Sequence, residues 1–279
     1  MKPSSQQQSD RRDRTSRIAL VATPLLTCAI LSQLPQVADA QPANQATQAL
    51  TAGAYFARGD YGETLDTRIS YLPLGYEFDT GKWGFQVLVP QLRLTGLGNV
   101  LVNVGGVTRA VASDEVTTSR GLGDSLVSLL YHFDPVSASA PFIDLRLDIK
   151  LPTADERQAL GTGEVDYSAQ LDLTQAWGSG ALFASLGYTV RGQSALYPGL
   201  TNSGFVQLGG SWPVSDKVSV GAYYDYRQSA SAFAPEVHEL VPFASWQLTD
   251  AWSFSGLLIW GFTDASADEA VFGQLRYSW

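Results

Sequence analysis

The 279-residue sequence contains one cysteine, Cys28, and one methionine, Met1, and both lie near the N-terminus. The rest of the chain therefore has no thiol for a disulfide, a cysteine metal site or thiol redox chemistry. Basic residues are also scarce, because 18 Lys/Arg stand against 27 Asp/Glu and give a net charge of −9. Nucleic-acid binding requires clustered Lys and Arg, so we expect no nucleic-acid partner. No metal or cofactor site is predicted.

The first forty residues have the order of a secretory signal peptide. Residues 1–17 carry five Lys/Arg, an apolar stretch runs from Ile18 to Leu34, and Ala38-Asp39-Ala40 follows as a small-residue cleavage site. We predict cleavage after Ala40 and a single mature domain, residues 41–279. The mature chain keeps 13 basic and 24 acidic residues, which is a net charge of −11.

The mature chain lacks any run of about 18 apolar residues, so no transmembrane helix is expected. Its dominant pattern has a period of two instead. The clearest example is residues 142–151, where five aliphatic residues from Ile143 to Leu151 alternate with Asp144, Arg146, Asp148 and Lys150. Such alternation predicts a strand with one apolar and one polar face. A soluble β-sandwich also alternates, so the pattern alone leaves both architectures open.

The connections between the expected strands favour a barrel. Twelve strands are expected, at residues 49–60, 66–78, 83–95, 119–133, 141–152, 165–177, 181–192, 202–213, 217–228, 238–248, 252–262 and 270–279. Short connections rich in turn formers, such as Gly178-Ser179-Gly180, alternate in phase with longer ones. Outer-membrane barrels alternate short periplasmic turns with longer external loops.

The sequence therefore predicts an all-β protein, a transmembrane antiparallel up-and-down β-barrel of about twelve strands. Both termini would lie on the periplasmic side, in the outer membrane of a Gram-negative bacterium, with outer-membrane lipid around the wall. Only about nine residues of the mature chain precede the first strand, so we expect no N-terminal plug.

Aromatic residues beside the short turns fit an interfacial girdle on the periplasmic side. They are Trp83, Phe133, Trp177, Trp212, Trp246 and Trp252. Core aromatics at the corners of a sandwich are the alternative. The last strand alternates up to a terminal aromatic, with Tyr277 and Trp279 on one face, and looks like the signal read by the β-barrel assembly machinery. That machinery is an expected partner.

Several short stretches resemble the outer-membrane family of the MetA-pathway of phenol degradation. They are Val89–Gly96, Gly121–Asp124, Ile149–Thr153 and Leu160–Gly163 running into Asp166-Tyr167, and Leu186–Thr189 extends the match. The resemblance spans most of the mature chain in the same order. It implies a monomeric or small-oligomeric barrel that passes small compounds, including aromatic ones.

Twelve strands should enclose a narrow lumen, because about eight leave an interior filled by side chains and about sixteen to eighteen leave a wide channel. The candidate lumen-lining residues are the polar partners of the aliphatic faces: Asp144, Arg146, Asp148, Lys150, Asp166, Gln170, Asp172, Asp225, Arg227, Gln274 and Arg276. They could form opposed acidic and basic ladders that favour small polar solutes. They could equally form ion pairs that plug the lumen. The first interpretation predicts a passive diffusion channel for small-molecule solutes, and the second a structural barrel.

The rival function is a hydrolase at the rim of the barrel. His238-Glu239 is expected near the external start of the tenth strand, beside Ser229 and Ser231, whereas His132 is expected at the periplasmic end. A general base must lie within hydrogen-bond reach of its nucleophile. Neighbouring strand residues face opposite ways, so His238 and Glu239 cannot pair directly. We assign no catalytic residue and expect a protein that is not an enzyme.

Two further features have plain structural explanations. Gly121, Gly123, Gly161 and Gly163 are expected to be turn and strand-kink glycines, because no Gly-Lys-Ser/Thr of a phosphate loop follows them. The apolar segment Gly96–Thr118 either folds inward as a constriction or extends strands three and four beyond the membrane, and extension is favoured slightly.

Overall fold

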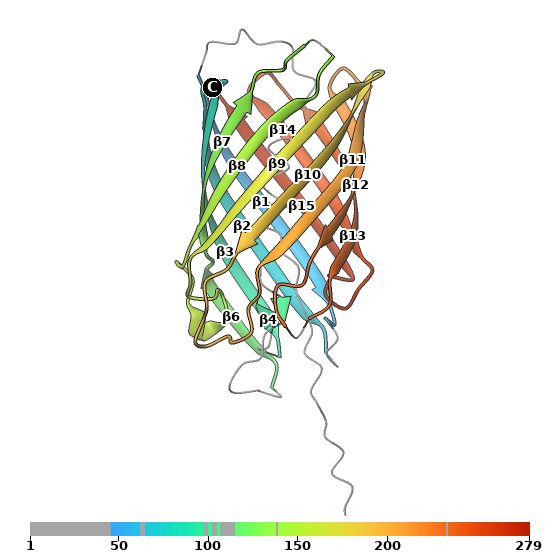
Figure 1. The fold of residues 1–279 in the computed structure, drawn as a ribbon. Coiled ribbons are helices and arrows are strands. Elements are labelled where there is room, and N and C mark those ends of the chain that lie inside the picture. Colours follow the sequence, from blue (N-terminus) through green and yellow to red (C-terminus); the bar gives the residue numbers. More distant parts are fainter. Residues whose placement is uncertain are drawn as a thin grey trace, which may run out of the picture.

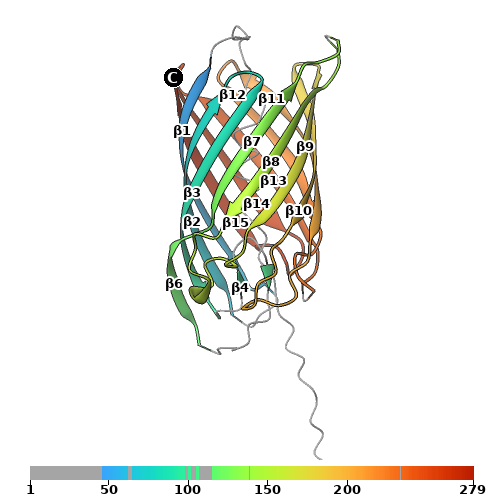
Figure 2. The same ribbon diagram turned by 60° about the vertical axis from the view of Figure 1, so that its left-hand side comes forward.

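A computed structural model describes residues 46–61, 65–97, 100–101, 105–106, 115–137, 139–232 and 234–279. The expected signal peptide, residues 1–40, lies outside this range. The main sheet runs in the order β2-β1-β15-β14-β13-β12-β11-β10-β9-β8-β7-β3-β6, and the pairing of β2 with β3 closes it into a barrel. Every pairing is antiparallel, which confirms the all-β up-and-down barrel (Figures 1 and 2). Within the described residues, no helix is long and apolar enough to cross a membrane.

The strand bounds follow the predicted ones closely. The strands are β1 (Thr47–Gly59), β2 (Thr67–Asp79), β3 (Trp83–Gly96), β4 (Val100–Leu101), β5 (Gly105–Gly106), β6 (Thr117–Leu122), β7 (Ser125–Phe133), β8 (Phe142–Leu151), β9 (Asp166–Trp177), β10 (Gly180–Val190), β11 (Ser203–Ser215), β12 (Val218–Arg227), β13 (Val237–Gln247), β14 (Trp252–Gly261) and β15 (Glu269–Ser278). A 3-10 turn, η1 (Glu156–Gln158), precedes β9. Because β6 and β7 together make one wall position, the barrel has the twelve strands that the sequence predicts.

The first and last strands meet to close the wall. They pair from Ala49 opposite Ser278 to Arg58 opposite Glu269, and the Gln48 amide donates to the Trp279 carbonyl at 3.1 Å. We name the end of the barrel with the short connections the turn end and the opposite end the loop end. Figures 1 and 2 show the turn end uppermost, with the C-terminus there and with strands strongly tilted to the barrel axis.

One wall strand is interrupted where the sequence predicted a continuous strand over residues 119–133. β3 pairs with β6 through Gln91–Gly96 and with β7 through Trp83–Leu88. Between these two ladders Pro90 has no amide hydrogen to donate, and only its carbonyl bonds, to the Gly123 amide at 3.0 Å. Gly123 is thus the expected kink glycine. Because the strand is interrupted there, the neighbouring Asp124 can contact Lys150 in the interior of the barrel.

The segment Gly96–Thr118 is described only in part. Gly96 pairs with Thr117, so strands three and four do extend to that level, and Val100–Leu101 pairs with Gly105–Gly106 as a separate small ladder. Most of the residues between, on which the alternative of an inward constriction depends, lie outside the described range.

The outer wall is apolar and carries aromatic residues at the turn end. Large outward side chains along the wall include Leu74, Leu186, Leu208, Leu258 and Val271, and each exposes a large part of its surface. The six aromatic residues expected beside the short turns are all exposed there. Trp83 lies 4.6 Å from Tyr131 and Trp252 lies 4.7 Å from Tyr277, measured between ring centroids. This is the arrangement expected of a girdle rather than of a sandwich core.

Candidate functional site in the barrel interior

All eleven residues predicted to line the lumen lie on the inner face of the wall. Nine of them are buried, and Arg146 exposes only 1% of its surface. Asp144 and Arg276 are half-buried near the turn end. The alternation of β8, β9 and β12 places these groups inward because residues i and i+2 share one face of a strand.

A chain of polar contacts runs along the inner wall from the turn end to the middle of the barrel. Arg276 Nε lies 3.0 Å from Glu77, and Gln86 donates to Glu77 at 3.2 Å. Gln86 also accepts from Arg146 Nη2 at 2.8 Å, and Arg146 Nε pairs with Asp148 at 2.8 Å. Gln86 and Glu77 were missed by the sequence analysis because their strands alternate less regularly.

His132 and two carboxylates form a second cluster at the turn end. Its Nδ1 lies 2.7 Å from Asp144 and its Nε2 lies 3.0 Å from Asp79. His132 is thus at the turn end, as the sequence predicted, and its imidazole lies between two acids.

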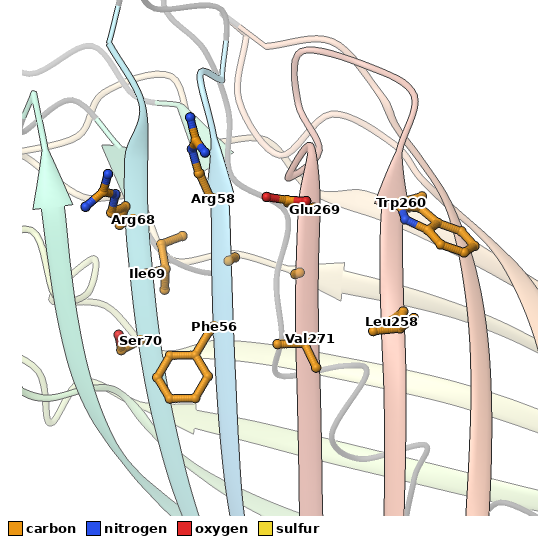
Figure 3. Close-up of a pocket in the computed structure, with 11 residues that line it drawn as sticks. Phe56, Arg58, Arg68, Ile69, Ser70, Leu258, Trp260, Glu269 and Val271 are labelled. Atoms are coloured by element: carbon orange, nitrogen blue, oxygen red, sulfur yellow. The ribbon is translucent and has the colours of Figure 1, made fainter.

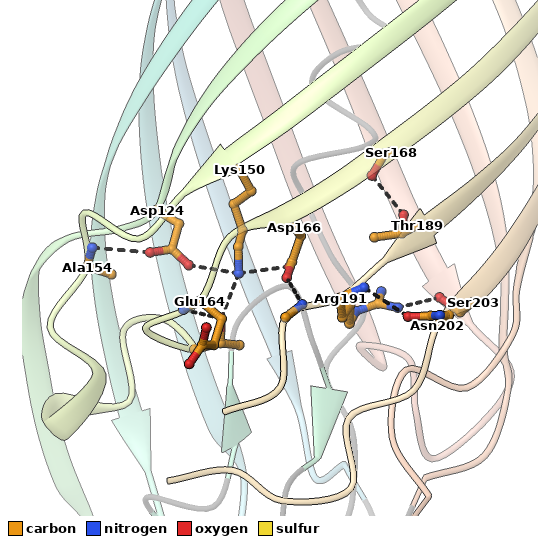
Figure 4. Close-up of polar contacts among 12 residues, drawn as sticks. Asp124, Lys150, Ala154, Glu164, Asp166, Ser168, Thr189, Arg191, Asn202 and Ser203 are labelled. Carbon is orange, nitrogen blue, oxygen red and sulfur yellow. Dashed lines mark hydrogen bonds and ion pairs between the residues drawn. The ribbon is translucent and has the colours of Figure 1, made fainter. Parts of the chain in front are cut away.

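Lys150 is the centre of a third cluster, near the loop end (Figure 4). Its Nζ lies 2.8 Å from Asp166, 3.2 Å from Asp124 and 2.7 Å from Thr162 Oγ1. Asp166 also accepts from the Gly192 amide at 3.0 Å. The ammonium group thus contacts two carboxylates and a hydroxyl. A buried charge requires such ion pairs and hydrogen bonds to offset its loss of hydration.

A fourth cluster lies on β12 and β13. Arg227 Nε pairs with Asp225 at 2.8 Å, and Arg227 Nη2 donates to Glu239 at 2.5 Å. Gln207 on β11 donates to Asp225 at 3.0 Å. Glu239 was considered only for rim chemistry in the sequence analysis, whereas its carboxylate faces inward and neutralises Arg227.

These contacts favour ion pairs over opposed ladders. Each of the four predicted cations, Arg146, Lys150, Arg227 and Arg276, lies within 3.2 Å of a carboxylate on its own or a nearby strand. Acid and base therefore neutralise each other along the wall, and charge is not separated across the lumen.

Several buried polar atoms still lack a protein partner within the described residues. They are Arg146 Nη1, Asp172 Oδ2, Gln207 Oε1, Tyr61 OH and Thr67 Oγ1. Leaving such an atom without a hydrogen bond costs about 1–3 kcal/mol, so buried groups of this kind normally bind water or a ligand. The interior therefore offers sites for water or for the polar groups of a solute.

Another part of the inner wall is apolar, which the sequence did not predict. Phe183, Tyr223 and Phe243 form a triangle with ring centroids 6.2 Å apart. They belong to one cluster with further buried residues, which include Tyr55, Ile69, Tyr71, Leu88, Leu92, Val241, Leu257, Ile259 and Phe272. A signal was present in the run Leu257-Leu258-Ile259-Trp260, because consecutive apolar residues make both faces of a strand apolar.

The rim residues do not assemble a catalytic pair among the described residues. His238 faces outward and its Nδ1 lies 2.5 Å from Tyr224 OH. Ser229 Oγ donates to the carbonyl oxygens of Ser231 and Ala234. The candidate base and the candidate nucleophile thus belong to separate hydrogen-bond networks.

Comparison with known proteins identifies the family. Residues 38–279 match the family model described as Putative MetA-pathway of phenol degradation. The chain belongs to this family. No curated protein sequence matches the chain.

An outer-membrane channel is among the solved structures that resemble the chain. An outer membrane channel from Pseudomonas putida F1 has a TM-score of 0.61 at 12% identity, covering 86% of this chain and 97% of that one. The KdgM porin has a TM-score of 0.49 at 8% identity, with 83% and 99% covered. The Pseudomonas putida toluene transporter TodX has a TM-score of 0.43 at 10% identity, with 90% and 93% covered. The first likeness shows that this member of the phenol degradation family has the fold of an outer-membrane barrel.

Three of the stretches that carried the family resemblance, Gly121–Asp124, Ile149–Thr153 and Leu160–Gly163, meet near Lys150. Thr153 Oγ1 donates to the Gly123 carbonyl at 2.8 Å and accepts from the Ser125 amide at 2.9 Å. The Ala154 amide donates to Asp124 at 3.1 Å, as Figure 4 shows. A Cβ on Gly161 would lie 2.6 Å from an Asp124 oxygen, so glycine is needed there for the close approach. The glycines and threonines of these stretches hold the Lys150 cluster in place.

Proposed function

We propose that the protein is an outer-membrane channel through which small solutes pass by passive diffusion. The solutes that fit its interior best are small compounds with an aromatic ring and a polar group. The observation that carries this proposal is the division of the inner wall into a self-neutralised polar part and an apolar, aromatic-lined part. A solute with one apolar and one polar side can contact both parts at once.

The proposal includes a location and an orientation. An apolar outer wall with an aromatic girdle suits a barrel embedded in lipid, and the family and the fold support the outer membrane of a Gram-negative bacterium. The turn end then faces the periplasm and the loop end faces the exterior. Residues 1–40 would direct export, and Tyr277 and Trp279 would be read by the assembly machinery.

The residues predicted to line the lumen have a specific role in this proposal. Arg146, Asp148, Lys150, Asp166, Asp225, Arg227 and Arg276 keep one part of the wall polar through ion pairs. Asp144, Gln170, Asp172 and Gln274 add hydrogen-bonding groups on the same inner face. The unpartnered atoms among them offer polar contacts to a passing solute.

A plugged structural barrel is the second candidate. The observation that favours it is that the charged groups pair with each other and are buried, which is what a lumen closed by ion pairs requires. The two candidates predict different electrical behaviour, because only an open lumen conducts ions.

Single-channel recording separates the two candidates. The refolded mature chain, residues 41–279, is placed in planar bilayers with and without small aromatic acids in the bath. We expect discrete openings that these acids block. The absence of channel openings would overturn the channel and favour the structural barrel, provided that heat-modifiable gel migration shows the protein to be folded.

A further inference from the structure

A row of arginines lies on the outer wall near the loop end. Arg58, Arg68, Arg93 and Arg120 are carried by the adjacent positions β1, β2, β3 and β6, and all four are exposed. Adjacent strands lie about 4.8 Å apart, so these four strands span about 14 Å of wall. Arg93 and Arg120 lie two positions farther from the loop end along the strands, because Arg93 is the register partner of Ser70 and not of Arg68. We name these four residues the arginine row.

The arginine row contains two direct like-charge pairs. Arg58 is the register partner of Arg68, and Arg93 is the register partner of Arg120. Like charges directly opposite each other on one face of a sheet destabilise the pairing of the strands. The two pairs lie on neighbouring strands, offset by two positions, and an anion that lies between them would relieve the repulsion within each pair.

The protein supplies only part of that negative charge. Asp66 pairs with Arg58 at 2.6 Å, and Glu269 is the register partner of Arg58 on the other side. For Arg68, Arg93 and Arg120 the described part of the chain provides no ion pair. Three guanidinium groups thus remain available on the outer surface.

An apolar groove of about 540 Å³ adjoins the row on the same outer wall. Figure 3 shows Arg58, Arg68 and Glu269 nearer the loops, with Phe56, Val271 and Leu258 below them toward the middle of the barrel. Phe56, Leu258, Trp260 and Val271 are each about half exposed. The loop side of the groove therefore carries Arg58, Arg68 and Glu269 beside Trp260, and the side toward the middle of the barrel is apolar.

We propose that the arginine row binds the headgroup phosphates of a membrane lipid and that the groove takes one of its acyl chains. Guanidinium groups bind phosphate by bidentate, charge-assisted hydrogen bonds. Within the groove, charged side chains at the loop side are followed by apolar ones toward the middle of the barrel, which is the order of headgroup and acyl chain in a lipid leaflet. This inference rests on the proposed location, in which the loop end lies at the outer leaflet. Diphosphoryl lipid A, the phosphorylated glycolipid of that leaflet, offers two phosphates to the three guanidinium groups of Arg68, Arg93 and Arg120.

The test is lipid titration of the refolded protein in mild detergent, followed by native mass spectrometry. The probes are diphosphoryl lipid A, its dephosphorylated form and phosphatidylcholine. The variants replace Arg68, Arg93 and Arg120 by Gln, singly and together, and a triple Arg→Lys variant retains charge without the planar fork. Lys217→Gln, which removes an exposed cation at the turn end, is the matched control.

We expect one tightly held diphosphoryl lipid on the wild type and a loss of about tenfold in affinity for each arginine removed. The triple Lys variant should bind with intermediate affinity, and Lys217→Gln should bind as the wild type does. Equal binding of the dephosphorylated lipid, or full affinity in the triple Gln variant, would overturn the inference. Displacement of the lipid by millimolar inorganic phosphate would show that the arginine row binds anions in general. That result would also overturn the inference.

The outcome is separable from that of the proposed channel. Conductance of the triple Gln variant should equal that of the wild type, because the row faces away from the lumen. A silent barrel that still holds the lipid would refute only the channel. A barrel that conducts but does not bind the lipid would refute only the lipid site. Dimers held together in place of lipid would show instead that a second copy occupies this face, which would overturn the inference.

Discussion

Arg146 and Asp148 form a buried ion pair, Nε to Oδ1 at 2.8 Å, although they stand only two positions apart on β8. Arg227 and Asp225 repeat the relationship on β12, also at 2.8 Å. Residues two positions apart share a face of a strand, so an acid and a base at this spacing can pair along the wall. Each of these cations is therefore neutralised by a carboxylate on its own strand. No counter-charge is needed in the aromatic part of the interior.

Lys150→Met should destabilise the barrel strongly. The substitution keeps an unbranched side chain, one atom shorter, but leaves Asp124 and Asp166 buried without their cation. Breaking a buried ion pair by removing one partner costs about 3–5 kcal/mol. The free energy of unfolding, measured by urea titration of the protein in lipid vesicles, should fall by that amount. Lys217→Met, at an exposed turn, is the control, and equal stability of the two variants would refute the role assigned to Lys150.

The partners of Arg146 and Lys150 show what could and could not be predicted from sequence. Asp148 is found by spacing alone, because an i, i+2 pair needs no knowledge of the neighbouring strands. Asp124 comes from a distant stretch and reaches Lys150 only because the wall strand is interrupted opposite Pro90. That interruption depends on how two strands register, which a single sequence does not reveal.

The fold itself was predictable, since turn chemistry and the period of two fix strand number and phase. The apolar part of the interior was not, because the prediction assumed that every inward face is polar. Where a run such as Leu257-Leu258-Ile259 makes both faces apolar, the alternation that identifies the inner face disappears. Phe243 and Tyr223 then become visible as an inner cluster only when β12 and β13 are placed side by side.

Phe243→Ala should raise the single-channel conductance. Phe243 contributes to the triangle with Phe183 and Tyr223, and removal of its ring opens the interior at that level. The loss of a large buried side chain also costs up to about 3–5 kcal/mol, so Phe243→Leu serves as a milder second variant. Leu208→Ala, on the outer face, should leave the conductance unchanged. An unchanged conductance in a folded Phe243→Ala variant would place the narrowest part of the lumen elsewhere.

Arg227→Gln should make the channel more selective for cations. The substitution removes the positive partner of Asp225 and Glu239 and leaves two carboxylates facing the interior. Rings or clusters of carboxylates attract cations into a pore. The reversal potential under a potassium chloride gradient should shift toward the potassium equilibrium potential. Arg227→Lys preserves the charge and should show no shift, whereas identical reversal potentials for both variants would mean that permeating ions do not pass this cluster.

Combined Tyr277→Ala and Trp279→Ala should slow assembly without much loss of equilibrium stability. Both rings lie exposed on the outer face at the turn end, where Tyr277 contacts Trp252 at 4.7 Å and Trp279 at 5.6 Å between centroids. Aromatic contacts of this kind contribute about 0.5–1.5 kcal/mol, so the folded barrel should tolerate their loss. The pairing of β1 with β15 is made by main-chain atoms and persists in the variant. We therefore expect slower insertion into vesicles that contain the assembly machinery, but an unchanged rate of refolding into detergent. Trp252→Ala removes a neighbouring ring outside the last strand and should assemble at the wild-type rate. If it slows insertion equally, the effect belongs to the girdle as a whole and not to a signal in the final strand.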